Sequence, residues 1–146
     1  MPRPPEAKNI GVAHGRWGED AAVEQLRLEG LCIIDRNVRP CREDRRIEID
    51  IIAYDRRLDA IVFVEVKQHK SRSESQRRLR SVTRHKLELL RRGCRTWLRR
   101  NRWEGAFRFD VIEVYGQPEE RRRAEVDHIR HVRLFKGEER FVNWED

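Results

Sequence analysis

The 146-residue sequence has no apolar stretch approaching the roughly 18 residues that a membrane-spanning helix requires. Its start, with three prolines in the first five residues, also lacks the apolar segment of a secretory signal. These two absences exclude the usual membrane and secreted classes. We therefore expect a cytoplasmic protein without a membrane partner.

Cysteine is scarce, and the three residues present, Cys32, Cys41 and Cys94, are scattered without a CxxC pair or a suitably spaced histidine. An odd, dispersed set excludes a disulfide framework and gives no sign of a structural zinc site. Cys32 and Cys94 stand among apolar residues, and we interpret both as small core residues.

The length suits one domain with a single core. Charged residues make up 40% of the chain and hydrophobic residues 38%, but the hydrophobic residues fall into organised runs, which argues against global disorder. Residues 1–12 show no periodic pattern and are expected to form a flexible leader. Residues 13–146 are expected to form the single domain.

The net charge of +7 is concentrated in one segment. Residues 77–102 contain ten arginines and one lysine against a single glutamate, so this segment carries +10 and the rest of the chain −3. A basic block of this kind is what binding to a phosphate backbone requires. The alternative is a solvated helix face in a chain that is rich in arginine throughout.

Hydrophobic periodicity predicts an α/β fold, with a mixed sheet and helices packed against it. The pattern indicates a helix over residues 16–29, strands over 31–38, 46–54 and 60–67, a long helix ending near residue 101, and a strand over 107–115. Residues 126–135 are ambiguous between a last strand and an extended tail. The five residues 55–59 suit a hairpin loop between the second and third strands.

The predicted hairpin brings acidic side chains together. Side chains two apart share a face of a strand, and symmetric closure by the loop puts Asp50 opposite Glu65, and Glu48 opposite Lys67. At an effective dielectric near 20, two such carboxylates repel by roughly 3 kcal/mol. A hard divalent cation, Mg²⁺ or Mn²⁺, would relieve this repulsion better than one lysine does. The alternative is an ordinary salt-bridge ladder on a solvent-exposed sheet face.

Asp50, followed after fourteen residues by Glu65, Val66 and Lys67, resembles the PD-(D/E)xK motif of the restriction-endonuclease-like superfamily. More of the chain, between residues 11 and 115, resembles the YraN-like bacterial family, which is similar in fold to archaeal Holliday junction resolvases. The segments that carry this second resemblance are Gly15 to Ala22, Arg36 to Arg39, Ile47 to Ala53, Val62 to Lys67, the helix with Lys86, and Arg108 to Val111.

The resemblance implies a restriction-endonuclease-like domain that hydrolyses phosphodiester bonds in DNA, in particular structured or branched DNA, with Mg²⁺ or Mn²⁺ as cofactor. It makes Asp50 and Glu65 metal ligands and catalytic residues, and Lys67 the residue that orients or activates the attacking water. Glu19 becomes a further catalytic acid reaching in from the first helix. The alternative for Glu19 is an exposed glutamate that favours the start of a helix.

Nucleic acid is the expected partner, DNA rather than RNA, and a homodimer is left open. We assign its binding to four basic residues of the long helix, namely Arg84, Lys86, Arg91 and Arg95. Lys86 lies near the apolar stripe of that helix, so it either contacts phosphate or extends past the stripe to solvent.

The chain departs from the family pattern at two places, with Ile47 where glycine is usual and Gln68, His69 and Lys70 where Lys-x-Arg is usual. The first departure bears on the hairpin twist or on the approach of backbone to phosphate. We interpret His69 as a loop residue, and His128 and His131 as structural residues.

Two other functions compete with the nuclease. One is a non-catalytic nucleic-acid-binding or adaptor domain that retains a nuclease-like fold. The other is a metal-free role of the acidic cluster in folding.

Overall fold

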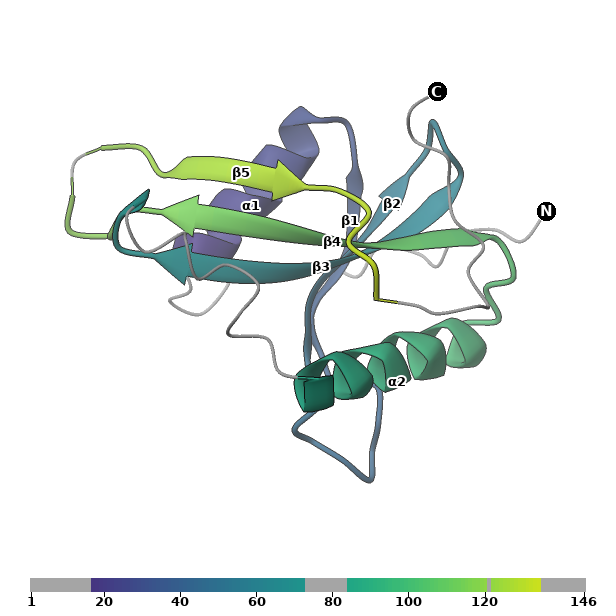
Figure 1. The fold of residues 1–146 in the computed structure, drawn as a ribbon. Helices are drawn as coiled ribbons and strands as arrows, with labels where there is room; N and C mark the ends of the chain where they lie inside the picture. The colour runs from purple at the N-terminus through teal and green to yellow at the C-terminus, as the bar shows by residue number, and fades with distance from the viewer. Residues whose placement is uncertain (1–16, 73–83, 121, 135–146) are drawn as a thin grey trace.

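The structure is a computed structural model, and it describes residues 17–72, 84–120 and 122–134. These residues form five strands and two helices, in the order predicted from the sequence. Figure 1 shows their arrangement. In chain order the elements are α1 (Trp17–Leu28), β1 (Cys32–Val38), β2 (Ile49–Asp55), β3 (Ala60–His69), α2 (Arg84–Arg100), β4 (Ala106–Tyr115) and β5 (Glu125–Ile129). The expectation of a single α/β domain with a mixed sheet is confirmed.

The strands lie side by side in the order in which they occur in the chain, β1-β2-β3-β4-β5. All neighbouring pairs are antiparallel except β3 and β4, which run parallel. Parallel neighbours need a long crossover, and the segment that contains α2 provides it. The central strand β3 is therefore paired along both edges, which explains its nearly unbroken apolar sequence.

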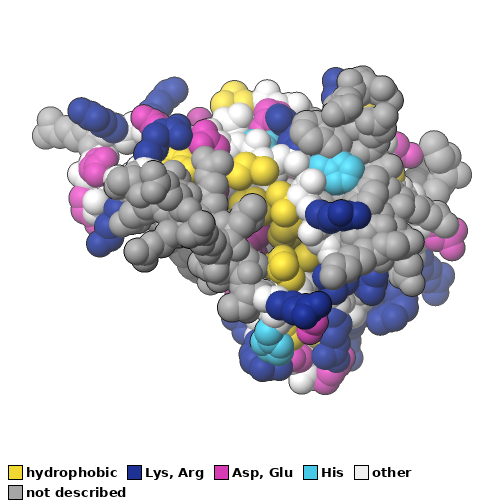
Figure 2. Space-filling model, viewed as in Figure 1, with side chains coloured by type: hydrophobic (Ala, Val, Ile, Leu, Met, Phe, Trp, Pro, Cys, Tyr) yellow, Lys and Arg dark blue, Asp and Glu magenta, His cyan; other side chains and the backbone are white. Residues whose placement is uncertain are grey.

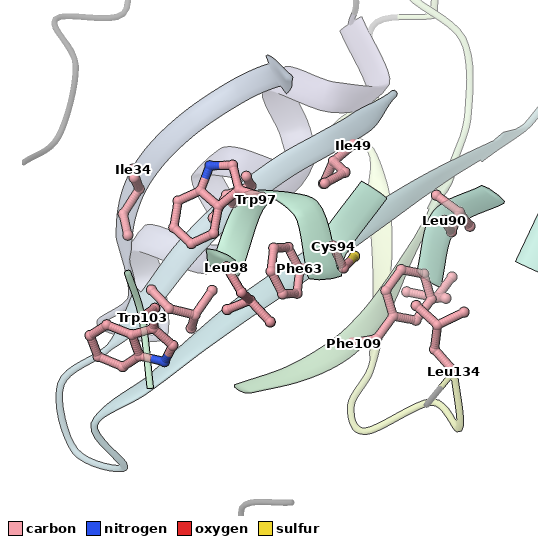
Figure 3. Close-up of a cluster of buried hydrophobic side chains, with 13 residues drawn as sticks. Ile34, Ile49, Phe63, Leu90, Cys94, Trp97, Leu98, Trp103, Phe109 and Leu134 are labelled. Atoms are coloured by element: carbon pink, nitrogen blue, oxygen red, sulfur yellow. The ribbon is translucent and has the colours of Figure 1, made fainter. Parts of the chain in front are cut away.

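The two helices cover opposite faces of the sheet, so the domain has three layers (Figure 1). The α1 face holds a cluster that includes Leu26 of α1 and Val62 and Val64 of β3. On the other face, Figure 3 shows Phe63 among Cys94, Trp97 and Leu98 of α2. The rings of Phe63 and Trp97 meet edge to face at 5.7 Å. No described helix is long and apolar enough to cross a membrane.

Gly30 allows α1 to end, and Gly93 allows α2 to pack closely against Ile47. Gly30 follows α1 with a φ of 88°, and the N–H groups of Gly30 and Leu31 bond to the carbonyls of Arg27 and Leu26. This pattern closes the C-terminal end of a helix and needs a residue that tolerates positive φ. Gly93 faces Ile47 so closely that a Cβ there would lie 2.5 Å from Ile47 Cγ2. The isoleucine that departs from the family pattern thus packs against α2.

Several element boundaries differ from the predictions. The second strand begins at Ile49, three residues later than expected, because residues 40–48 form turns before the sheet. The third strand continues to His69, so the interpretation of His69 as a loop residue was wrong. The ambiguous C-terminal segment contains a strand, β5, because it pairs with β4 along Tyr115 to Val111.

Some expectations fall partly outside the described residues. The expected leader, residues 1–12, and the first part of the long helix, residues 76–83, lie there. Cys94 is fully buried, as predicted for a core residue. Cys32 is partly exposed because it begins β1 at the edge of the sheet, so its assignment to the core was wrong.

Candidate functional site

The β2–β3 hairpin has the register that was predicted from its loop, since Ile51 pairs with Val64 and Ile52 with Phe63. Asp50 and Glu65 are the next two residues in this register. The pairing of β2 with β3 ends at Ile51 and Val64, just before these two residues. Asp50 Oδ2 instead accepts a hydrogen bond from the backbone N–H of Val66, at 2.8 Å. The two carboxylates therefore lie where the two strands stop pairing.

The environment of Asp50 disfavours its charge. Burial raises the pKa of Asp50 to about 7, and the charge of Glu65 contributes in the same direction. The N–H of Val66 opposes the shift but does not cancel it. The contribution of Glu65 is the electrostatic repulsion that was expected from the sequence. A cation between the two carboxylates would remove it.

Two lysines approach the same oxygen of Glu65, whose residue is only 7% exposed. Lys67 Nζ lies 3.3 Å from Glu65 Oε1, and Lys86 Nζ, from α2, lies 3.1 Å from it. Lys86 thus turns its ammonium group toward the carboxylate pair, although its side chain is partly exposed. The sequence could not predict this contact, because it depends on how α2 crosses the sheet.

The pKa values of the two lysines are shifted in opposite directions. Burial, followed by a hydrogen bond with Lys86, lowers the pKa of Lys67. Burial also lowers the pKa of Lys86, but the hydrogen bond with Lys67 and the charge of Glu65 outweigh it and raise the pKa overall. Lys67 is therefore the amine that loses its proton more readily, and Lys86 is the one that keeps its charge.

Glu19 is buried in α1, which excludes the alternative of an exposed glutamate at the helix start. Its Oε1 accepts hydrogen bonds from Arg36 Nε at 2.9 Å and from Asn37 Nδ2 at 3.0 Å. Asn37 has a φ of 51°, a conformation that asparagine adopts more readily than most residues. Glu19 therefore joins α1 to β1. Its charge also contributes to the raised pKa of Asp50.

The donor set fits a hard divalent cation bound together with a substrate. Among the residues that the structure describes, no three His, Cys, Asp or Glu side chains are gathered closely enough to hold a metal ion. Mg²⁺ is commonly held by only one or two carboxylates, with water and substrate phosphate filling its other positions. Asp50 and Glu65 fit this kind of site, and a site formed by the protein alone would need more ligands.

Figure 2 shows Lys and Arg side chains gathered around α2, in the lower part of the view. Of the four residues assigned to nucleic-acid binding, Arg84 and Arg95 are exposed. Lys86 is directed at Glu65, and Arg91 Nε donates a hydrogen bond to the carbonyl of Leu134 at 2.7 Å. Two of the four assigned side chains are therefore exposed, and the other two contact groups of the protein itself.

Glu113 is a buried acid on the same sheet face that sequence reasoning missed. It pairs in register with Lys67, accepts a hydrogen bond from the hydroxyl of Tyr115 at 2.9 Å, and lies 3.5 Å from His69 Nε2. The alternation of Phe109, Val111 and Glu113 places Glu113 on the face covered by α2. The sequence did not indicate that β4 would lie next to β3.

His128 takes part in a second buried group, on the face covered by α1. Its Nε2 lies 2.7 Å from Asp110 Oδ2, and its Nδ1 lies 2.8 Å from Glu29 Oε2. Arg108 Nε donates to both oxygens of Asp110, at 3.1 and 3.2 Å. The interpretation of His128 as structural agrees with this placement, which ties α1, β4 and β5 together.

Residues 18–114, which include Asp50, Glu65, Lys67 and Lys86, match the family described as Uncharacterised protein family UPF0102. The chain belongs to this family. The resemblance to the YraN-like family is thereby confirmed. The wider resemblance to the nuclease superfamily rests on the motif formed by Asp50, Glu65 and Lys67.

Several relatives in other organisms carry the family name UPF0102. A UPF0102 protein of Trichlorobacter lovleyi is 39% identical over 103 residues, which cover 70% of this chain and 76% of the relative. One from Syntrophotalea carbinolica is 37% identical over 117 residues, covering 79% and 86%. One from Mycobacterium sp. (strain JLS) is 41% identical over 105 residues, covering 70% and 73%.

Proposed function

We propose that this chain is a Mg²⁺- or Mn²⁺-dependent endonuclease with a restriction-endonuclease-like fold that hydrolyses phosphodiester bonds in DNA. The observation that carries the proposal is the carboxylate pair Asp50 and Glu65 at the end of the hairpin, with Lys67 beside it. The motif resemblance supports the same assignment. The likeness of the family to archaeal Holliday junction resolvases supports structured or branched DNA as the substrate.

Asp50 and Glu65, with the backbone carbonyl of Val66, are the groups that would hold the cation. When bound, the cation would polarise the scissile phosphate and lower the pKa of an attacking water. Asp50 must lose its proton to act as a ligand, and its raised pKa means that binding releases a proton near neutral pH.

The chain's own side chains supply the remaining steps. Lys67, with its lowered pKa, orients the attacking water or takes its proton. Lys86 keeps its charge and stabilises the negative charge that develops on the phosphate. Glu19, fixed by Arg36 and Asn37, adds negative charge near the carboxylate pair and so favours a cation there.

The nucleic acid would lie across the face covered by α2, with its phosphates near Arg84 and Arg95. Each phosphate neutralised by a basic side chain releases counterions, so log affinity falls with log salt by roughly 0.9 per contact for duplex DNA. Arg91, partly buried and bonded to Leu134, is proposed to contribute mainly through its charge. A homodimer would present two such sites, and analytical ultracentrifugation tests that arrangement.

Calorimetric titration of Mn²⁺ into the wild type and Asp50→Asn tests the metal site. We expect binding to the wild type and none to the variant, with Glu24→Gln, an exposed α1 position, as a charge-matched control. Equal binding by Asp50→Asn would refute the site.

Cleavage of branched DNA with Mg²⁺ tests turnover. We expect it to disappear in Lys67→Ala and to persist in Lys70→Ala, an exposed lysine three residues further along. Equal residual cleavage in both variants would point to a contaminating nuclease.

A non-catalytic nucleic-acid-binding domain is the second candidate. The observation that favours it is that two ammonium groups already lie within 3.3 Å of Glu65 Oε1, which neutralises the carboxylate without a metal. This candidate predicts salt-sensitive DNA binding that EDTA does not alter, and no Mn²⁺ binding by the wild type. Failure to bind nucleic acid at low salt would exclude it.

A further inference from the structure

A cavity of about 640 Å³ lies far from the carboxylate pair, between the end of α1, the β2–β3 hairpin loop and the start of β4. Its volume falls within the roughly 300–1,000 Å³ typical of ligand pockets. Asp55, at this end of β2, is five residues from Asp50, so the cavity is near the opposite end of the strand, roughly 17 Å along it. Nothing in the proposed nuclease uses this cavity.

Arginine dominates the charge of the lining. Four arginines, Arg56, Arg57, Arg108 and Arg130, face two acids, Glu29 and Asp55. Both acids are already paired inside the protein. Asp55 Oδ2 lies 3.3 Å from Arg108 Nη1, and Glu29 bonds with Arg130 and with His128. The lining therefore has positive charge in excess.

Arg56 and Arg57 supply that excess. They are exposed, and within the part of the chain that the structure describes their side chains form no hydrogen bond or ion pair. Neither guanidinium group is paired with a carboxylate of the described residues, so both remain available to an anion in the cavity. Guanidinium also binds the oxygens of a phosphate through two parallel N–H donors.

The hairpin loop that carries these arginines is ordered by hydrogen bonds from side chains in and beside the loop. Asp55 Oδ1 accepts the backbone N–H groups of Arg57 at 3.0 Å and Leu58 at 3.3 Å. The hydroxyl of Tyr54 donates to Asp59 Oδ1 at 2.5 Å. A loop ordered in this way loses little conformational freedom when a ligand binds.

The base of the site is similarly fixed. Arg108 is 1% exposed and is held by Asp110 and Asp55 on two sides. A helix C-terminus, such as that of α1, repels anions through its free carbonyls. Here the N–H groups of Gly30 and Leu31 satisfy the carbonyls of Arg27 and Leu26, which weakens that repulsion.

We propose that this cavity binds a phosphate group of a nucleotide or of a nucleic-acid strand end. Arg56 and Arg57 hold the phosphate oxygens at the mouth. Glu29 and Asp55 accept hydrogen bonds from hydroxyl or amino groups of the attached sugar or base. The site is independent of the carboxylate pair, and it does not require that the chain be a nuclease.

The experiment measures binding of a fluorescent 5′-nucleoside monophosphate, and of a short single strand with and without a 5′-phosphate, at fixed ionic strength without metal. The test variant is Arg56→Gln/Arg57→Gln. The control is Arg122→Gln/Arg123→Gln, a second pair of adjacent exposed arginines, which lies in the β4–β5 connection. Asp50→Asn serves as a further control, because it removes the proposed nuclease and leaves the cavity intact.

We expect Arg56→Gln/Arg57→Gln to weaken binding by roughly tenfold or more, since each lost arginine removes charge-assisted hydrogen bonds to phosphate. The other two variants should bind like the wild type. Equal affinity for nucleotide and phosphorylated strand identifies a free nucleotide as the ligand, whereas a stronger preference for the phosphorylated strand identifies a strand end. Equal weakening by both arginine pairs, or no binding by the wild type, would overturn the proposal.

Discussion

Asp50 Oδ2 accepts the backbone N–H of Val66 at 2.8 Å, which ties the carboxylate of β2 to the residue between Glu65 and Lys67. This hydrogen bond holds Asp50 beside the segment that carries Glu65 and Lys67, the other two residues of the proposed motif. In this arrangement burial and the charge of Glu65 disfavour the ionised form of Asp50. The stability of the protein should therefore depend on pH.

Without metal, the free energy of unfolding should fall as pH rises from about 4 to about 8. Unfolded Asp50 loses its proton near its ordinary pKa of 3.8, whereas folded Asp50 keeps it up to about pH 7. In that window the folded state binds more protons, so stability falls with rising pH, by on the order of 2 to 4 kcal/mol.

Urea unfolding at pH 5 and pH 8 in EDTA measures this loss. Asp50→Asn should show a much smaller loss, and Mg²⁺ should restore the wild type at pH 8. Parallel pH profiles for the wild type and Asp50→Asn would contradict the prediction.

Replacing Lys86 by methionine should raise the pKa of Lys67. The hydrogen bond with Lys86 is one of the causes that lower it, and Glu65, which remains, favours the charged form of Lys67. Titration of ¹³C-labelled lysine side chains by NMR follows the change directly. Lys70→Met, at an exposed position, is the matched control, and a Lys67 titration unchanged in Lys86→Met would show that the two amines are not coupled.

Gly93→Ala should destabilise the protein, although alanine is the better helix former by about 1 kcal/mol. The new Cβ would lie 2.5 Å from Ile47 Cγ2, and Ile47 is 1% exposed and cannot move aside freely. Overpacking of this kind typically costs about 1–3 kcal/mol, so a small net loss is expected.

The double variant Gly93→Ala/Ile47→Ala removes Cγ2 of Ile47, the methyl group that the new Cβ at residue 93 would contact. The loss of stability of this double variant, measured by thermal unfolding, should therefore be smaller than the sum of the losses of the two single variants. Additive losses would mean that Gly93 and Ile47 do not constrain each other.

His128→Ala should cost about 3 kcal/mol of stability, because it leaves Asp110, which is fully buried, without one of its hydrogen-bond partners. Both ring nitrogens of His128 lie within hydrogen-bond distance of a carboxylate oxygen, at 2.8 Å from Glu29 and 2.7 Å from Asp110. Chemical denaturation measures the loss. His85→Ala, at an exposed position of α2, should change stability by no more than about 0.5 kcal/mol, and similar losses in the two variants would argue against the buried group.

The hairpin could be predicted because its signal is local. Alternation along two apolar strands and a five-residue loop were enough to place Asp50 next to Glu65 in register. Lys86 was assigned to nucleic-acid binding, and its contact with Glu65 could not be predicted because it depends on the crossing of α2 over the sheet. Glu113 and the group around His128 were missed because they depend on which strands become neighbours.

The crossover that carries α2 has a consequence for how the protein matures. The β2–β3 hairpin closes over a short loop and can form as soon as residue 69 has been synthesised, whereas Lys86 arrives only with the helix that follows. Until then the emerging chain holds two acids near one lysine, Lys67. During that interval the repulsion between Asp50 and Glu65 is compensated less than in the complete fold, in which Lys86 Nζ also lies 3.1 Å from Glu65 Oε1.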